Sequence, residues 1–133
     1  MKKGIMRVIK GIGIAVVGIP LLLIALFIVC EVFGAVVNHA ATGKQTKEIR
    51  NMISEEIDDA QIIDVQSETG NSSGTGNHVD CLTRISFTSG KDEETIAGIL
   101  DKGYEFFDLR SENDIYTVTI ITGAPFRDNI EGH

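Results

Sequence analysis

The chain has 133 residues, with 12 Lys or Arg against 19 Asp or Glu, so its net charge is −7. This charge is divided unevenly. Residues 1–10 contain four basic and no acidic residues, whereas residues 44–133 contain eight basic and eighteen acidic residues, a net −10. A segment this acidic repels nucleic acid, so we do not expect nucleic acid as a partner. About ninety residues suffice for one small domain but not for two.

The most informative segment runs from Gly11 to Cys30, twenty residues without a charge. A helix of this length spans about 30 Å, the thickness of the hydrocarbon core of a bilayer. We therefore expect residues 11–30 to contact the lipid bilayer. They belong to a predicted transmembrane anchor and outer extension that together comprise residues 11–37. Because the basic residues lie before the span and Glu31 follows it, residues 1–10 are expected in the cytoplasm and residues 44–133 outside the cell membrane.

Two alternatives to an uncleaved single-pass anchor remain open. A cleaved signal peptide also begins with a basic region and an apolar core, but that core is typically 7 to 15 residues long. Here the apolar character continues past Glu31 to Val37. A lipoprotein would carry its lipid on Cys30, but processing needs a small residue before the cysteine, and Val29 occupies that position.

Small residues recur along the expected span at Gly11, Ala15 and Gly18, on nearly one helical face. Small residues let membrane helices approach closely, so this face is compatible with a homo-oligomer formed through the anchor. The ordinary glycine content of membrane helices explains the same pattern.

Beyond a linker at residues 38–43, the sequence predicts one α+β domain at residues 44–124 and a tail at residues 125–133. Apolar residues at helical spacing predict a helix from Gly43 to Ala60, with Ile49, Ile53 and Ile57 in its buried stripe. Alternating apolar residues then predict two strands, at residues 62–67 and 79–88. A Gly, Ser and Asn-rich stretch, residues 69–77, is expected to connect them as a flexible loop.

The same order of elements then repeats. Acidic residues at positions 92–94 favour a helix start and Gly103 its end. Strands are expected at residues 104–110 and 115–122. Residues 62–68 align with residues 106–112, with identical Asp, Ser and Glu, and residues 84–90 align with residues 117–123. The sequence therefore predicts a duplicated αββαββ domain with two layers, in which both helices cover one face of a four-stranded antiparallel sheet.

This arrangement divides the sheet residues between two faces. The expected core consists of the apolar positions of both units: Ile49, Ile53, Ile57, Ile63, Val65, Ile85, Phe87, Ile96, Leu100, Phe107, Leu109, Val118 and Ile120. The opposite, open face is expected to carry polar side chains: Asp64, Gln66, Arg84, Ser86, Asp108, Arg110, Thr117 and Thr119. An antiparallel sheet tolerates such a face in water, so it needs no functional explanation.

Candidate functional residues come from this open face, and five of them form the predicted binding residues: Asp64, Gln66, Arg84, Asp108 and Arg110. Asp64 and Asp108 occupy equivalent positions in the two units and would form a pair of acids if they approached each other. The scattered histidines show no metal-ligand spacing, and no cofactor motif is present, so no metal or cofactor is expected.

The function that fits these features is a membrane-anchored extracytoplasmic domain that binds another protein or a cell-envelope component, without catalytic activity. A small envelope hydrolase that uses the acids of the open face is the alternative from a different class. A third interpretation is an accessory subunit of a membrane complex, in which the anchor helix makes the essential contacts.

The expected topology predicts the result of proteolysis on intact cells. Protease should digest the chain beyond Lys44 and leave residues 1–10 protected by the membrane. The measurement is immunoblotting with tags at each end of the chain. A soluble chain that begins near Ala41 would contradict the anchor and support a cleaved signal peptide.

Overall fold

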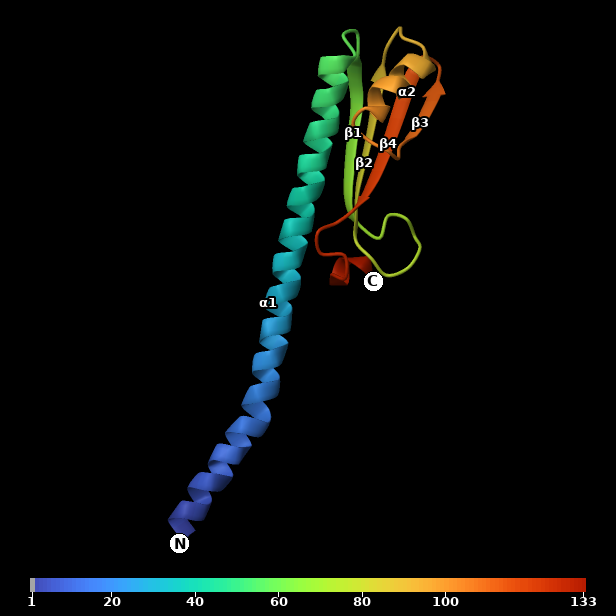
Figure 1. The fold of residues 1–133 in the computed structure, drawn as a ribbon. Helices are drawn as coiled ribbons and strands as arrows, with labels where there is room; N and C mark the ends of the chain where they lie inside the picture. Colours follow the sequence, from blue (N-terminus) through green and yellow to red (C-terminus); the bar gives the residue numbers. More distant parts are fainter. Residues whose placement is uncertain (1) are drawn as a thin grey trace. The chain divides into compact units, whose positions relative to one another are not determined.

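The structure is a computed structural model and describes residues 2–133. These residues form an α+β fold with the expected four-stranded antiparallel sheet. Its elements, in chain order, are helix α1 (Lys2–Glu56), strands β1 (Gln61–Gly70) and β2 (Asp80–Thr88), helix α2 (Glu93–Asp101), strands β3 (Asp108–Glu112) and β4 (Ile115–Gly123), and the 3-10 helix η1 (Ile130–Gly132). Figure 1 shows this arrangement.

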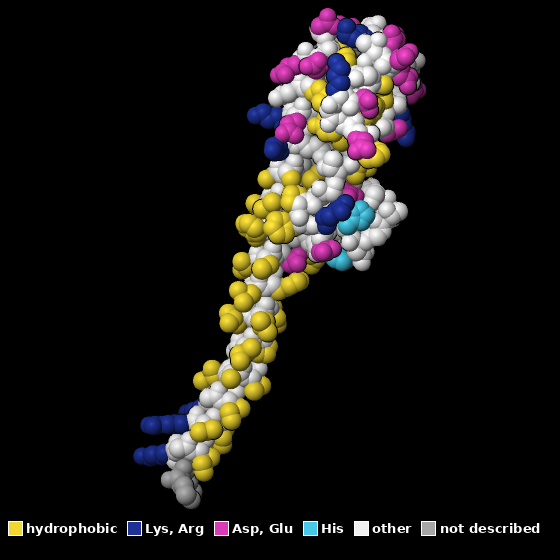
Figure 2. Space-filling view, viewed as in Figure 1, with side chains coloured by type: hydrophobic (Ala, Val, Ile, Leu, Met, Phe, Trp, Pro, Cys, Tyr) yellow, Lys and Arg dark blue, Asp and Glu magenta, His cyan; other side chains and the backbone are white. Residues whose placement is uncertain are grey.

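The chain divides into two compact units, one ending at Phe33 and the other comprising Gly34–His133. In the first unit, helix α1 contains Pro20 and an 18-residue window with a mean hydropathy of 3.0. By length and composition this stretch is a candidate membrane span, a property that signal sequences share. Hydrophobic side chains follow this stretch along the face seen in Figure 2. A membrane helix tolerates Pro20 because the loss of one backbone hydrogen bond is readily compensated there.

Within the second unit, the structure differs from the sequence analysis over residues 38–43. These residues belong to helix α1, where a linker was expected, and Asn38 and Thr42 are buried. Their polar character suggested a solvated connection. Both side chains instead face the sheet and the C-terminal segment, where hydrogen bonds satisfy them. The compact unit therefore begins before the expected domain start at residue 44.

The sheet has the strand order β1-β2-β4-β3, so each predicted helix-strand-strand unit supplies one central and one edge strand. Strands β2 and β4 pair with Ile85 opposite Val118, the two residues that the sequence alignment of the units equates. At the edges, Val65 pairs with Ile85 and Leu109 pairs with Val118, which are again equivalent pairs. The two edge pairings therefore involve residues that the sequence alignment equates.

Both helices contribute to one hydrophobic core on the same face of the sheet. The buried cluster contains nine expected residues of α1, β2, α2 and β4: Ile49, Ile53, Ile57, Ile85, Phe87, Ile96, Leu100, Val118 and Ile120. It also contains Tyr116. Helix α2 begins as predicted, because Asp92 Oδ1 accepts a hydrogen bond from Thr95 N at 2.7 Å and caps it. This hydrogen bond lowers the pKa of the Asp92 carboxyl.

Four expected core residues on the edge strands are less buried. Ile63 is 57% exposed and Val65 is 37% exposed, so their placement in the core was wrong. An irregularity in β1 between Ile62 and Asp64 makes Ile63 an extra residue, and Ile62 takes the core-facing position opposite Phe87. Val65 lies on β1, an edge strand that pairs only with β2 among the described strands. Phe107 and Leu109 are partly buried against the core.

Residues 125–133, expected to form a tail, belong to the second unit and pack against α1 and the start of β2. The Asn38 side chain pairs with the backbone of Phe126, donating to its carbonyl and accepting from its N–H, both at 2.9 Å. Gly34 permits this close approach, because a Cβ at that position would lie 2.7 Å from Asn129 Nδ2. Val79 N donates to Arg127 O at 2.9 Å, which joins the segment to the start of β2 as well.

The buried face of α1 changes from polar to apolar along its length. Gln45 is buried; its amide nitrogen donates to Cys81 O at 3.0 Å and to Thr83 Oγ1 at 3.3 Å, and its Oε1 accepts from Thr122. Thr46 Oγ1 lies 2.8 Å from the same Thr83 hydroxyl. Buried polar groups are costly unless paired, so these contacts favour a single position of the helix along β2 and β4.

The core predicts unequal effects for the same truncation at two phenylalanines. Phe87→Ala should lower the free energy of unfolding by about 3 to 5 kcal/mol, because Phe87 is fully buried and leaves a cavity. Phe106→Ala is the matched control and should cost little, because Phe106 is 78% exposed. Urea denaturation of the purified chain measures both; equal losses would contradict the core described here.

The contact between Asn38 and Phe126 predicts that loss of the Asn38 side chain loosens the C-terminal segment. Asn38→Ala removes both hydrogen bonds and should destabilise the docked segment by about 1 to 3 kcal/mol, the cost of leaving partners unsatisfied. The amides of residues 124–133 should then exchange faster with solvent, measured by hydrogen exchange. Asn51→Ala, on the exposed side of α1, is the control and should leave their exchange unchanged. Unchanged exchange in both variants would refute the role of Asn38.

Candidate binding surface

The five predicted binding residues lie on the open face of the sheet, and each of them bonds to a near neighbour. On β1, Gln66 Nε2 donates to Asp64 Oδ2 at 2.8 Å. On β3, Arg110 Nε makes the equivalent contact with Asp108 Oδ2, also at 2.8 Å. Arg84 Nε donates to Thr119 Oγ1 at 3.3 Å. The open face is therefore a set of exposed, locally paired side chains.

The structure does not bring Asp64 and Asp108 together. Asp64 lies on the edge strand β1, opposite Ser86, and Asp108 lies on the other edge strand, β3, opposite Thr119. With β2 and β4 between them and strands about 4.8 Å apart, the two carboxylates are separated by about 14 Å or more. Paired acids in glycoside hydrolases lie about 5 to 9.5 Å apart, so these two do not form such a pair.

The open face also has an apolar end that the sequence analysis missed. There, Leu82 is buried and pairs with Ile121, which is 43% exposed. Phe106 lies next to this end because the chain enters β3 only at Asp108. Leu82 and Ile121 were not among the residues expected on the open face, although they alternate with Thr83 and Ile120 of the buried face. Their position beside Phe106 depends on where β3 begins, which the alternation of β2 and β4 does not record.

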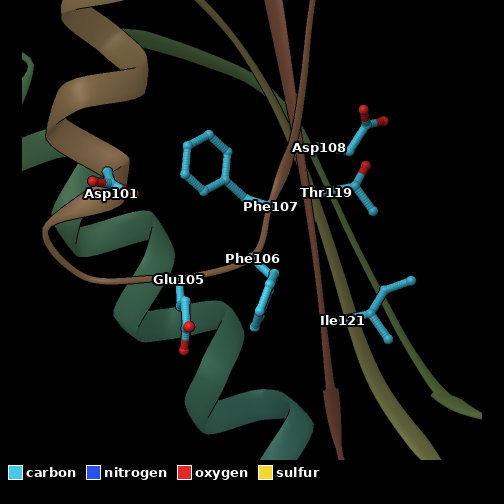
Figure 3. Close-up of a pocket in the computed structure, with 7 residues that line it drawn as sticks. All are labelled: Asp101, Glu105, Phe106, Phe107, Asp108, Thr119 and Ile121. Carbon is cyan, nitrogen blue, oxygen red and sulfur yellow. The ribbon is translucent and has the colours of Figure 1, made fainter.

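Phe106 and Ile121 line a shallow groove of about 500 Å³. Its other lining residues include three acids, Asp101, Glu105 and Asp108. Figure 3 shows Asp101 and Glu105 on the side of the helices, whereas Asp108 and Ile121 lie on the side of the sheet. Phe107 also lines the groove and is partly buried against the core. The result is an apolar groove with acidic side chains along both walls.

The groove is built on a firmly held segment. Gly103 follows α2 and lies against the side chain of Met52 on α1, whose terminal methyl group occupies the space of a Cβ at that position. Tyr104 N then donates to Leu100 O at 3.0 Å. Burial raises the pKa of the Tyr104 phenol, and the nearby Glu48 carboxylate raises it further. The segment that presents Phe106 to solvent is therefore anchored just before it by Tyr104.

A second cluster resembles a catalytic triad only in composition. His78 Nε2 lies 3.1 Å from Ser73 Oγ and 3.2 Å from Oδ2 of the buried Asp80. In a working triad, the serine and the carboxylate contact opposite nitrogens of the imidazole, so that one orients the ring while the other exchanges a proton. Here both contact the same nitrogen. The cluster therefore organises the loop between β1 and β2 and does not activate the serine.

Among residues 2–133, no group of three or more His, Cys, Asp or Glu is placed to hold a metal ion. Comparison of the chain with protein-family models, with curated proteins and with solved structures finds no match. Functional interpretation therefore depends on the geometry of the second unit, where the groove around Phe106 combines exposed apolar area with concentrated negative charge.

Proposed function

We propose that this chain is a single-pass membrane protein whose second unit lies outside the cytoplasm and binds another protein through the groove around Phe106, without catalysis. The observation that carries the proposal is the exposure of Phe106, 78%, next to the half-exposed Ile121. Aromatic side chains presented in this way are typical of the residues that dominate protein interfaces.

Several features of the first unit support membrane anchoring. Every side chain from residue 3 to residue 30 is exposed, as expected for a helix surrounded by lipid and unlike a helix in the core of a soluble protein. The four basic residues before Gly11 suit the anionic inner surface of a cell membrane. The anchor would hold the binding domain near the membrane surface.

The charge of the second unit favours a basic partner. Acidic side chains gather over the end of this unit that carries α2 and β3 (Figure 2). Three of them, Asp101, Glu105 and Asp108, line the groove itself. A protein segment with Lys or Arg beside an apolar residue would match both the rim and the floor. Such attraction between exposed charges weakens as salt is raised.

The hydrolase alternative has less support. The two acids on which it depends lie on opposite edges of the sheet, and each bonds to a neighbouring side chain. Pockets that carry out hydrolysis are concave and partly shielded from water, whereas these acids are exposed on an open face. A binding surface requires neither a shared proton nor a shielded pocket.

Co-purification from membranes tests the proposal, with the tagged full chain at low salt. Phe106→Ala should reduce retention of the bound protein by about thirtyfold, the effect of losing an interface residue worth about 2 kcal/mol. Ile63→Ala is the matched control, since it also removes an exposed apolar side chain from the sheet but lies on β1. Equal retention by both variants, or no retained protein with the unmodified chain, would contradict the proposal.

A further inference from the structure

Strand β4 lies between β2 and β3, and it extends beyond the start of β3. Pairing between β3 and β4 stops at Asp108 opposite Thr119. Pairing between β2 and β4 continues to Gly123 opposite Asp80. Over residues 120–123, β4 is therefore paired on one side only, and in the described chain no strand occupies the position in line with β3. The vacant position borders the groove around Phe106.

The hydrogen-bond pattern identifies the backbone groups that face this vacant position. Ala124 N donates to Val79 O at 3.0 Å, which continues the register of β2 and β4 by one pair. In antiparallel strands, alternate residues bond to the same neighbour. Ile120 and Thr122 therefore bond to β2, whereas the N–H and C=O of Ile121 point toward the vacant side.

The surroundings limit what can pair there. On the open face, the side chain of Ile121 lies near Phe106 and presents apolar surface (Figure 3). On the helix side, Asp101 and Glu105 present negative charge. At the far end, the Arg127 guanidinium lies over Gly123, where a Cβ would come within 2.5 Å of it, so the free edge is short.

We propose that the groove binds an extended segment of the partner protein, with alternating apolar and basic residues, that adds beside β4 in line with β3. This inference rests on the proposed function and specifies its ligand. The residue opposite Ile121 exchanges both backbone hydrogen bonds with it, and its side chain lies on the same face, against Ile121 and Phe106. The flanking residues point to the other face, toward Asp101 and Glu105, where Lys or Arg is favoured.

A helical ligand fits these observations less well. The backbone groups of a helix bond within the helix itself, so a helix would cover the N–H and C=O of Ile121 without satisfying them. An added strand satisfies both, and it meets the two different walls with the two alternating faces of one chain.

The test uses a synthetic probe, acetyl-Lys-Val-Lys-Val-Lys-Val-amide, and two isomers of it that are methylated on the backbone nitrogens of either the valines or the lysines. In the proposed pose, valine N–H groups face β4 and lysine N–H groups face away. The protein is the full chain carrying Phe106→Trp, in phosphatidylcholine nanodiscs. The natural chain contains no Trp, so fluorescence reports on the groove alone.

We expect the unmodified peptide and the lysine-methylated isomer to bind with similar affinity, and the valine-methylated isomer to bind at least about tenfold more weakly, because it loses the donor to Ile121. Binding of the unmodified peptide to the chain with its natural Phe106 should also slow hydrogen exchange at the Ile121 amide. Equal affinity of the two methylated isomers would overturn strand addition, as would failure of the unmodified peptide to bind.

These outcomes are separable from failure of the proposed function. If the peptides fail while retention of the cellular partner still depends on Phe106, the binding function stands and the strand-addition mode is wrong. If retention does not depend on Phe106, the proposed function itself fails, whatever the peptides do.

Discussion

The full-length pairing of β2 with β4 is the interaction on which the second unit depends. It places Ile85 opposite Val118 at the centre of the sheet and fixes the register of both edge strands through those two residues. The core then forms where α1 and α2 cover this central pair, with Phe87 and Tyr116 stacked at 5.8 Å between ring centroids. A slip of one residue between β2 and β4 would turn these side chains to the open face.

Helix α1 meets this central pair with two kinds of contact. Ile49, Ile53 and Ile57 supply nonspecific apolar burial, which tolerates small shifts along the helix axis. Gln45 and Thr46 supply directional hydrogen bonds to β2 and β4, which do not tolerate them. Asn38 extends the polar part to the C-terminal segment. Apolar contacts thus contribute attraction, and the polar contacts specify where the helix lies.

The features relevant to binding follow from a difference between the two edge strands. Strand β1 pairs with β2 over nine positions, whereas β3 pairs with β4 over only five. Because β3 begins only at Asp108, the pairing of β3 with β4 does not reach Ile121, which lines the groove with Phe106. At the position that the sequence alignment equates with Phe106, Ile62 faces the core because β1 has an extra residue at Ile63. The groove around Phe106 therefore lies beside the shorter edge strand.

The sequence by itself determined the apolar span, the order αββαββ and most of the core, because periodicity records which face of each element is apolar. It also determined the equivalence of Ile85 and Val118, since the two helix-strand-strand segments share a local pattern. Tertiary structure decided what depends on neighbours distant in the chain. Polar residues at 38 and 45 are buried only because partners on β2, β4 and residue 126 satisfy them. Likewise, Asp64 and Asp108 are separated by the strand order, and the groove at Phe106 exists because β3 is shorter than β4, neither of which local periodicity encodes.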